Sequence, residues 1–211
     1  LSHSSAASDV YKRQEITPTP IPVAVEDEIF ICDGTDQVTL EVNVDPSQQV
    51  PDAVVYYWTY NNVDIVAGLS ESEGGNSITL GGENPEHVLL LGDYTVTAFN
   101  TESGCFSDTV ISVIQGFTPV LEDDTSFTKC ANGDVELSVN ITNDPNLSND
   151  YIYSWVINGE EVGNESVFVH TEDLPDGPVQ VVVSDMVSMC SSETIVTVSY
   201  THLTLPTSVT V

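Results

Sequence analysis

The stretch VVYYWTYNNVDIV, residues 54–66, decides the fold of this chain, because it returns in altered form as DYIYSWVINGEEV, residues 150–162. Each stretch has a tyrosine and a tryptophan two residues apart, as Tyr56 and Trp58 in the first, so both rings point to the same side of an extended strand. An Asn-Asn or Asn-Gly pair follows, and Asn-Gly after an apolar strand is a strong signal for a tight type I′ hairpin. Each stretch is therefore predicted to be a core strand that ends in a hairpin turn.

The two stretches belong to a tandem duplication, which is the most informative feature of the sequence. The matching positions are Cys32 with Cys130, Leu40 with Leu137, Tyr56 with Tyr153, Trp58 with Trp155, and Asn61 with Asn158. Gly116-Phe117, followed by Thr-Pro, is a turn signal between the copies. We therefore predict one domain over residues 15–116 and a second over residues 117–197.

Apolar residues alternate with polar ones on both sides of the tryptophans. VTLEVNV (residues 38–44) and VELSVNI (residues 135–141) have the period of two that is typical of half-buried strands. No useful window has a helical period. About seven short strands per copy, with turns about every 8–12 residues, are typical of a β-sandwich, and a barrel is the alternative.

The two ends of the chain are related as DNA. SSAASDVYKRQ (Ser4–Gln14) can be encoded by DNA whose reverse complement encodes VSYTHLTLPT (Val198–Thr207). Residues 1–14 and 198–211 therefore resemble a sequencing adapter translated at both ends of a metagenomic fragment, and such scars are excluded from fold reasoning. We expect their deletion to leave the melting temperature nearly unchanged, unless the second tail completes the last strand.

Acidic side chains dominate the charge. The chain has 33 Asp and Glu against 3 Lys and Arg, a net charge of −30; because Asp9, Lys12 and Arg13 lie in the first adapter-like end, 32 acidic residues remain against Lys129. Such a surface repels nucleic acid and anionic lipid, and no apolar run approaches the length of about 18 residues that suggests a membrane span. We expect no nucleic-acid partner and no membrane insertion of this fragment.

Each copy has two cysteines, one before its second strand and one between its last two strands. Four cysteines allow three pairings. One bridge per copy, Cys32–Cys105 and Cys130–Cys190, follows from the duplication and would add about 4 kcal/mol per bridge on the loop-entropy model. Disulfides would imply an oxidising compartment, and four buried thiols are the alternative.

The sequence contains no motif of a known catalytic site, so we expect no enzyme. His87 and His170 have no partner motif nearby and are interpreted as solvated or strand-edge residues. Trp58 and Trp155 are interpreted as core residues rather than carbohydrate platforms, because a sandwich needs a large aromatic on that strand.

Calcium is the one cofactor that the sequence suggests, and no other is expected. The first candidate set alternates as the ligands of a calcium loop do, in Asp144, Asn146, Ser148 and Asp150, but the glycine and glutamate of an EF-hand are missing. The second set follows the domain boundary, at Glu122, Asp123 and Asp124. Hydrated loops are the alternative, since Asx-Pro turn chemistry explains the first set without a metal.

The layout of the copies resembles the immunoglobulin-like and PKD-like repeats of large surface proteins from gliding, type 9-secreting bacteria. The residues that carry this resemblance in the first copy are Cys32, Tyr56, Trp58, Asn61, Gly92, Tyr94, Val96, Gly104 and Cys105. Those of the second copy are Cys130, Tyr153, Trp155, Asn158, Gly159, Gly177 and Cys190. Val179 replaces Tyr94 in the second copy, and the acidic Gly-Asp-Gly turn of PKD repeats is absent. We therefore predict an all-β chain of two tandem immunoglobulin-like β-sandwich domains.

The resemblance implies a secreted or bacterial cell-surface location, in tandem arrays that act as stalks, spacers or adhesive modules. We hypothesise a structural or adhesive repeat module without catalysis, whose partners are neighbouring repeats of the same chain and a surface glycan or protein ligand. The alternative is a polysaccharide-binding accessory module of a secreted hydrolase. Three coplanar exposed rings would favour that alternative, and the candidates are Tyr60, Phe99, Phe106 and Phe168.

Overall fold

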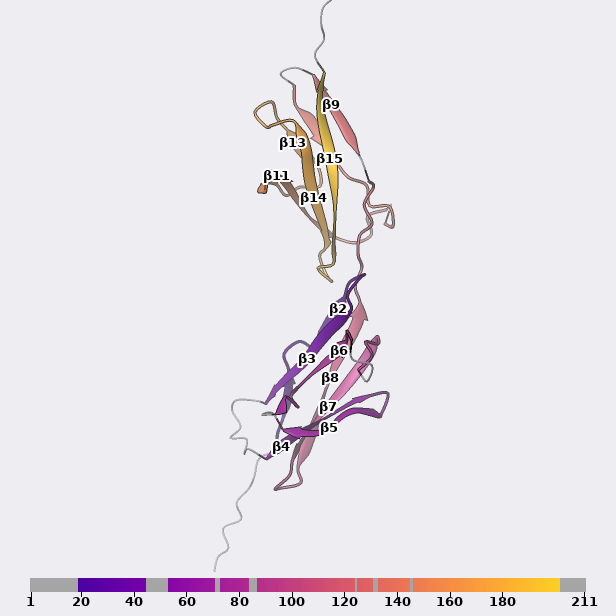
Figure 1. Ribbon diagram of the computed structural model, residues 1–211, viewed down its shortest axis with the longest axis vertical. Coiled ribbons are helices and arrows are strands. Elements are labelled where there is room, and N and C mark those ends of the chain that lie inside the picture. Colours follow the sequence, from indigo (N-terminus) through magenta and orange to yellow (C-terminus); the bar gives the residue numbers. More distant parts are fainter. Residues whose placement is uncertain are drawn as a thin grey trace, which may run out of the picture. The chain divides into compact units, whose positions relative to one another are not determined.

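The chain is built from β-strands, and the described residues contain no α-helix (Figure 1). The computed structural model describes residues 19–44, 53–70, 73–83, 87–123, 125–130, 133–144 and 146–201. Three parts of the predictions lie outside these residues, namely the tail 1–14, the end of the second tail from residue 202, and the calcium candidate Asp124.

The strands of the first repeat form two sheets. The smaller sheet has the order β1-β3-β6, with β1 (Pro22–Ala24), β3 (Gln37–Val44) and β6 (Ser77–Gly81). The larger sheet has the order β2-β8-β7-β4-β5, with β2 (Glu28–Ile31), β8 (Phe106–Gln115), β7 (Gly92–Asn100), β4 (Val54–Tyr60) and β5 (Val63–Ser70).

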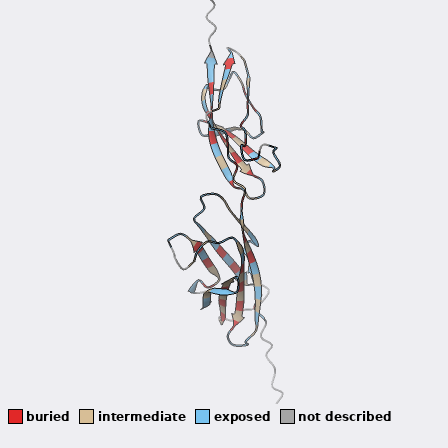
Figure 2. Cartoon of the chain, turned by 90° about the vertical axis from the view of Figure 1, so that its right-hand side faces the viewer, coloured by how far each residue is buried: buried red, intermediate tan, exposed pale blue. Residues whose placement is uncertain are grey.

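The predicted alternation places one face of each sheet in the core, and Figure 2 shows buried and exposed positions alternating along the strands. Leu40 and Val42 of β3 are fully buried, as are Trp58 of β4 and Val96 of β7. The indole Nε1 of Trp58 donates a hydrogen bond of 2.8 Å to the carbonyl of Gly75, just before β6. This bond satisfies the one polar group of a buried ring, so the prediction of a core tryptophan is confirmed.

The second repeat has the same strand order. Its larger sheet is β12-β11-β14-β15-β9, with β12 (Glu160–Gly163), β11 (Tyr151–Ile157), β14 (Gly177–Asp185), β15 (Ser191–Thr201) and β9 (Ser126–Cys130). Its smaller sheet pairs β10 (Val135–Leu137) with β13 (Phe168–His170), and an isolated bridge from Leu121 to Ile141 stands where the first repeat has β1.

Both repeats are immunoglobulin-like β-sandwiches, as predicted. In each, a tryptophan packs into a core made by the facing sheets, Trp58 from β4 and Trp155 from β11, which is the arrangement expected of this fold. Trp155 is fully buried, stacks on Phe168 at 5.6 Å between ring centroids, and donates 2.8 Å to the carbonyl of Glu165. The bond therefore repeats the one made by Trp58.

The two hairpin turns also form where the sequence places them. Tyr60 pairs with Val63 across Asn61-Asn62, and Ile157 pairs with Glu160 across Asn158-Gly159. All four turn residues have positive φ, of 51°, 62°, 53° and 85° in chain order. A type I′ turn requires positive φ at both central residues, which asparagine and glycine tolerate.

The described chain divides into two compact units that do not coincide with the two repeats. One unit holds Thr39–Val88, Gly92–Ser112 and the stretch that ends at Asp27. The second unit holds Glu28–Val38, Leu89–Leu91 and the chain from Val113 onward. The second unit therefore includes the segment Glu28–Val38 of the first repeat, which contains Cys32.

The last strand runs past the predicted end of the second domain. Val198 is 2% exposed within the second core, and β15 continues to Thr201 in parallel pairing with β9. The first four residues of the adapter-like tail therefore continue the strand, which is the exception that the sequence analysis left open.

Candidate functional site

The disulfide bond connects a cysteine of the first repeat to a cysteine of the second. Cys32 is bonded to Cys190, with 5.3 Å between their Cα atoms and a sequence separation of 158, whereas Cys105 and Cys130 are free. The expected pairing of one bridge per repeat is therefore corrected. Both bonded cysteines lie in the second unit, since that unit includes Glu28–Val38.

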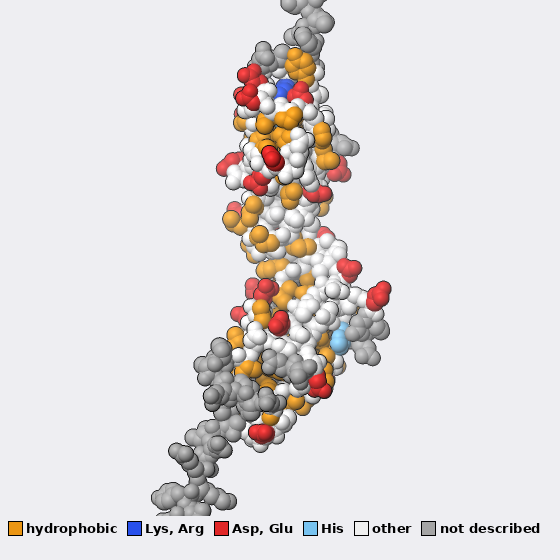
Figure 3. Space-filling view, turned by 60° about the vertical axis from the view of Figure 1, so that its left-hand side comes forward, with side chains coloured by type: hydrophobic (Ala, Val, Ile, Leu, Met, Phe, Trp, Pro, Cys, Tyr) orange, Lys and Arg blue, Asp and Glu red, His pale blue; other side chains and the backbone are white. Residues whose placement is uncertain are grey.

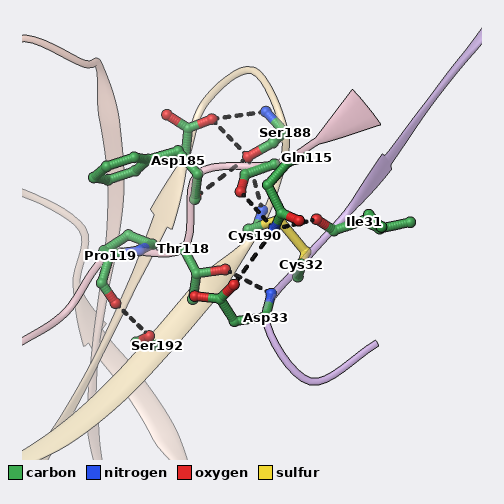
Figure 4. Close-up of a disulfide and its surroundings, with 12 residues drawn as sticks. Ile31, Cys32, Asp33, Gln115, Thr118, Pro119, Asp185, Ser188, Cys190 and Ser192 are labelled. Atoms are coloured by element: carbon green, nitrogen blue, oxygen red, sulfur yellow. Dashed lines mark hydrogen bonds between the residues drawn. A yellow bond between two sulfur atoms is a disulfide. The ribbon is translucent and has the colours of Figure 1, made fainter. Parts of the chain in front are cut away.

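Residues of the segment that links the repeats hold the chain on both sides of Cys32 (Figure 4). The Gly116 amide donates 2.8 Å to the Ile31 carbonyl, and the Gln115 side-chain amide donates 3.1 Å to the same oxygen. On the other side, the Asp33 amide donates 3.0 Å to the Thr118 hydroxyl.

The turn before Cys190 is held by one carboxylate. Asp185 Oδ2 accepts hydrogen bonds from the Ser188 amide at 2.7 Å, the Ser188 hydroxyl at 2.8 Å and the Val187 amide at 3.2 Å. The Asp185 amide in turn donates 2.9 Å to the Cys190 carbonyl. The side chain of an aspartate thus replaces backbone partners in the turn, and Cys190 enters β15 in a fixed position.

Gly116 lies against the sulfur of Cys190. A Cβ atom at this position would be 2.5 Å from Cys190 Sγ and 2.9 Å from Ser188 Cβ, which is closer than non-bonded atoms approach. The linking segment can therefore pass the disulfide only because residue 116 has no side chain. Sequence reasoning noted Gly116 as a turn signal and missed this contact.

The two free cysteines lie at the surface. Cys105 is half-buried and Cys130 is exposed, and Phe106, next to Cys105, is 60% exposed. No group of three or more His, Cys, Asp or Glu side chains within the described ranges could hold a metal ion.

The first calcium candidate is a hydrogen-bonded turn. Asp144 is buried, and its carboxylate accepts bonds from the Ser148 hydroxyl at 2.6 Å, the Tyr151 hydroxyl at 2.7 Å, and the amides of Ser148 and Asn149 at 3.0 Å each. These bonds, with the Ser148 hydroxyl as the largest contribution, lower the pKa of Asp144. The Asp144 oxygens are therefore occupied by protein donors, and Ser148 serves as a donor to Asp144.

The described residues of the second calcium candidate lie between the Leu121–Ile141 bridge and β9. Glu122 Oε2 accepts a bond of 2.6 Å from the Asn140 side-chain amide. Asp123 lines a surface cavity together with Gln180 and Glu193. Asp124 lies outside the described residues, so calcium binding here stays a prediction.

A second surface cavity lies beside the Asp144 turn, with a volume of about 540 Å³. Its titratable lining groups are Glu122, Asp144 and Tyr153. Both carboxylates already accept hydrogen bonds from neighbouring groups, and burial raises the pKa of the Tyr153 hydroxyl. The two carboxylates that line this cavity are therefore engaged with protein donors.

His170 is fully buried, which corrects its interpretation as a solvated residue, and it is the last residue of β13 in the two-stranded sheet, in agreement with the strand-edge alternative. Its Nε2 lies 3.2 Å from the Pro175 carbonyl, which can only accept, so this nitrogen carries the proton. Its Nδ1 then accepts from the ammonium of Lys129 at 3.5 Å. Lys129 is 6% exposed and forms a salt bridge of 2.9 Å with Asp176, so the lysine that adjoins Cys130 anchors the end of β9.

The aromatic candidates for a glycan platform do not share an exposed face. Phe168 is buried against Trp155, Tyr60 packs on Tyr94 at 4.9 Å, and Phe99 meets Tyr57 edge-on at 6.3 Å. Phe106 is the exposed member of the set. Within the described residues, these four rings do not form the row of coplanar exposed rings that the polysaccharide-binding alternative requires.

No protein-family model matches the chain, and no curated protein matches it. Among solved structures, it is similar to the fibronectin(III)-like modules of Clostridium thermocellum CbhA, with 10% identity over 88% of this chain and 97% of that chain and a TM-score of 0.49. It is also similar to three N-terminal domains of the bacteriophage RB49 Highly Immunogenic Outer Capsid protein, with 17% identity over 85% of this chain and 59% of that chain and a TM-score of 0.41. Immunoglobulin domains 1–5 of Sidekick-1 match with 14% identity over 88% of this chain and 40% of that chain, and a TM-score of 0.38. Likenesses this low do not transfer a function.

Proposed function

We propose that this chain is a structural or adhesive repeat module of a secreted or cell-surface bacterial protein and acts as a stalk without catalysis. The observation that carries the proposal is the Cys32–Cys190 disulfide. It closes a loop across a sequence separation of 158, and this loop contains all of the described strands except β1, β2 and β15. Such a bond suits a protein that bears load along its chain.

The mechanical argument follows from the path of the covalent bonds. A force applied to the two ends of the chain passes from Cys32 through the disulfide to Cys190, and the residues between them carry none of it. The hydrogen bonds of Gln115, Gly116 and Thr118 hold the same segment in place before any load is applied. Unfolding of the closed loop would therefore add no length to a stalk.

The location outside the cytoplasm is supported by the same bond. Disulfides persist in oxidising compartments and are rare in the cytosol of mesophiles. On the loop-entropy model, a loop of this length adds about 5 kcal/mol of stability in the folded chain. Among the described residues, no helix is long and apolar enough to cross a bilayer. Figure 3 shows acidic side chains scattered over the visible surface, which suits a solvated module.

Pulling a single molecule by its two ends tests this proposal. With the disulfide intact, we expect no extension from residues 33–189 at forces that unfold the reduced protein. Reduction should release up to about 520–570 Å of additional length, because an extended chain spans about 3.3–3.6 Å per residue. The double variant Cys32→Ser/Cys190→Ser is the control and should show the full extension without reductant. Release of this additional length from the oxidised protein without reductant would contradict the proposal.

A further inference from the structure

The two free cysteines occupy the same positions in their repeats as the two bonded ones. Cys105 matches Cys190, because each lies between the last two strands of its repeat, after β7 and β14 respectively. Cys130 matches Cys32, because each lies at the C-terminal end of the strand beside the last strand of its repeat: Cys130 is the last residue of β9, and Cys32 directly follows β2. Each repeat therefore has one bonded and one free cysteine, and the free cysteine of each repeat is equivalent to the bonded cysteine of the other.

The turn before Cys105 is closed by the same bonds as the turn before Cys190. The Asn100 amide donates 2.8 Å to the Cys105 carbonyl, and the Gly104 amide donates 2.8 Å to the Asn100 carbonyl. Asn100 Oδ1 accepts from the amides of Glu102 at 2.9 Å and Ser103 at 3.0 Å.

Every one of these bonds has a counterpart in the second repeat. Asp185 stands at the position of Asn100, its amide donates 2.9 Å to the Cys190 carbonyl, and its carbonyl accepts 2.9 Å from the Met189 amide. After the cysteine, Ser107 donates to the Pro20 carbonyl as Ser192 does to the Pro119 carbonyl. Cys105 is therefore presented as Cys190 is, but without a bonded partner.

Cys130 is likewise held as Cys32 is. The Cys130 carbonyl accepts 3.1 Å from the Gly133 amide, and the Cys32 carbonyl accepts 3.0 Å from the Thr35 amide. Cys130 is the last residue of β9 and Cys32 directly follows β2, and each accepts the same type of turn hydrogen bond from the residue three positions later. The exposed thiol of Cys130 leaves its sulfur open to a partner.

One polar group beside Cys105 lacks a partner. The side chain of Asn100 is fully buried, and its Nδ2 makes no hydrogen bond with the described residues. A buried donor without an acceptor costs about 1–3 kcal/mol. In the equivalent turn of the second repeat, the Ser188 hydroxyl lies 3.4 Å from the Phe117 carbonyl of the linking segment. The Cys105 turn therefore holds one donor that has no acceptor among the described residues.

We propose that Cys105 and Cys130 are the halves of two further disulfides that join this pair of repeats to repeats of the same type on either side. The rule is the one that Cys32–Cys190 follows, in which the first cysteine of a repeat bonds to the second cysteine of the next. Cys105 thus takes the first cysteine of a preceding repeat, and Cys130 takes the second cysteine of a following one. This inference rests on the proposed function as a repeat module.

The bond forms by thiol–disulfide exchange with an oxidised protein dithiol carrier. The thiolate of one cysteine attacks a sulfur of the carrier disulfide, and the resulting mixed disulfide is attacked by the thiolate of the neighbouring repeat. The protein gains one disulfide and loses two protons and two electrons, and the carrier leaves as a dithiol. An oxidising compartment supplies such carriers.

The consequence for an array is that the disulfide loops overlap. The segment between Cys130 and Cys190 lies inside the loop closed by Cys32–Cys190 and, under this proposal, also inside the loop that begins at Cys130. Any two successive bonds therefore share one repeat. Reduction of one bond leaves most of that repeat within the neighbouring loop.

A two-copy protein tests the pairing rule. The first copy runs to Tyr200 and the second begins at Thr19, and Gly-Phe joins them to reproduce the natural order Gln115-Gly-Phe-Thr-Pro. After oxidation with glutathione, thiols are counted by maleimide mass labelling of the denatured, non-reduced protein. We expect two free thiols, because Cys130 of the first copy bonds to Cys105 of the second. Four free thiols would overturn the proposal.

The variant Cys130→Ser in the first copy alone makes the count unambiguous. If Cys130 is bonded, this change releases its partner and raises the count from two thiols to three. If Cys130 is free, the same change lowers the count from four to three and the pairing rule is wrong. The single chain is the control for the proposed function, since its Cys32–Cys190 bond forms or fails independently of a third repeat.

Discussion

Truncation after Thr197 removes the residues by which the adapter-like tail completes β15. Val198 is 2% exposed, and the residues from Val198 to Thr201 pair with Phe127–Cys130 of β9. Full burial of a valine stabilises a fold by about 1.5–3 kcal/mol, and each lost ladder hydrogen bond costs about 1 kcal/mol more. We expect the truncated chain to lose about 4 kcal/mol of unfolding free energy.

Urea unfolding followed by tryptophan fluorescence measures this loss, because Trp155 lies in the same core as Val198. With a denaturant slope of about 1–3 kcal/mol per molar, the midpoint of the second sandwich should fall by more than about 1 M. A chain that ends at Thr201 is the matched control and should unfold within about 0.5 kcal/mol of the full chain. Equal midpoints for the chains that end at Thr197 and Thr201 would refute the reasoning.

Two further predictions concern single side chains. The pKa of Asp144 is lowered in the folded protein, so its contribution to stability is present above the pKa of the unfolded chain, about 3.9, and is lost as the pH falls through the folded value. We therefore expect the variant Asp144→Asn to lose less urea resistance than the unchanged protein between pH 5 and pH 2. An equal loss in the two proteins would show that the hydrogen bonds of Asp144 do not persist in solution. Gly116→Ala places a methyl group 2.5 Å from Cys190 Sγ and should destabilise the oxidised protein by about 1–3 kcal/mol. The control Gly133→Ala, whose added methyl group has its nearest neighbouring atom at 3.4 Å, should change the melting temperature little. Equal melting temperatures for the two variants would contradict the close approach at Gly116.

The sandwiches could be predicted because their signals are local. Tyr56 and Trp58 face the core together because side chains alternate along a strand, and Asn158-Gly159 forms a type I′ turn because these residues tolerate positive φ. Such rules need only the neighbouring residues. They hold in both repeats, and this is why the duplication strengthens every one of them.

The disulfide could not be predicted by the same means. Duplication makes Cys32 equivalent to Cys130 and Cys105 equivalent to Cys190, and this equivalence is kept equally well by bonds within repeats and by bonds between successive repeats. Loop entropy does not decide between them, since each doubling of loop length changes the closure cost by only about 0.6 kcal/mol. The pairing is decided by the packing of residues 28–38 in the second unit, which the sequence pattern does not show.

The buried polar residues were missed for a related reason. His170 has no motif around it, because its partners Lys129 and Pro175 come from another strand and from a following loop. Asp144 suggested a calcium loop, because alternating oxygen ligands and a self-contained hydrogen-bonded turn use the same residue types. Its bonds to Ser148 and Tyr151 distinguish the two arrangements, and they are visible only in the folded chain.

Trypsin cleavage of the oxidised, denatured and thiol-blocked chain tests the central claim most directly. After residue 13, Lys129 is the single Lys or Arg, so cleavage there leaves Cys32 and Cys105 in one large fragment and Cys130 and Cys190 in the other. The Cys32–Cys190 bond predicts that the two large fragments migrate as one species of nearly full mass on a non-reducing gel and separate only after reduction. Two fragments that separate without reductant would show bonds confined to each repeat, or none, and would contradict the account.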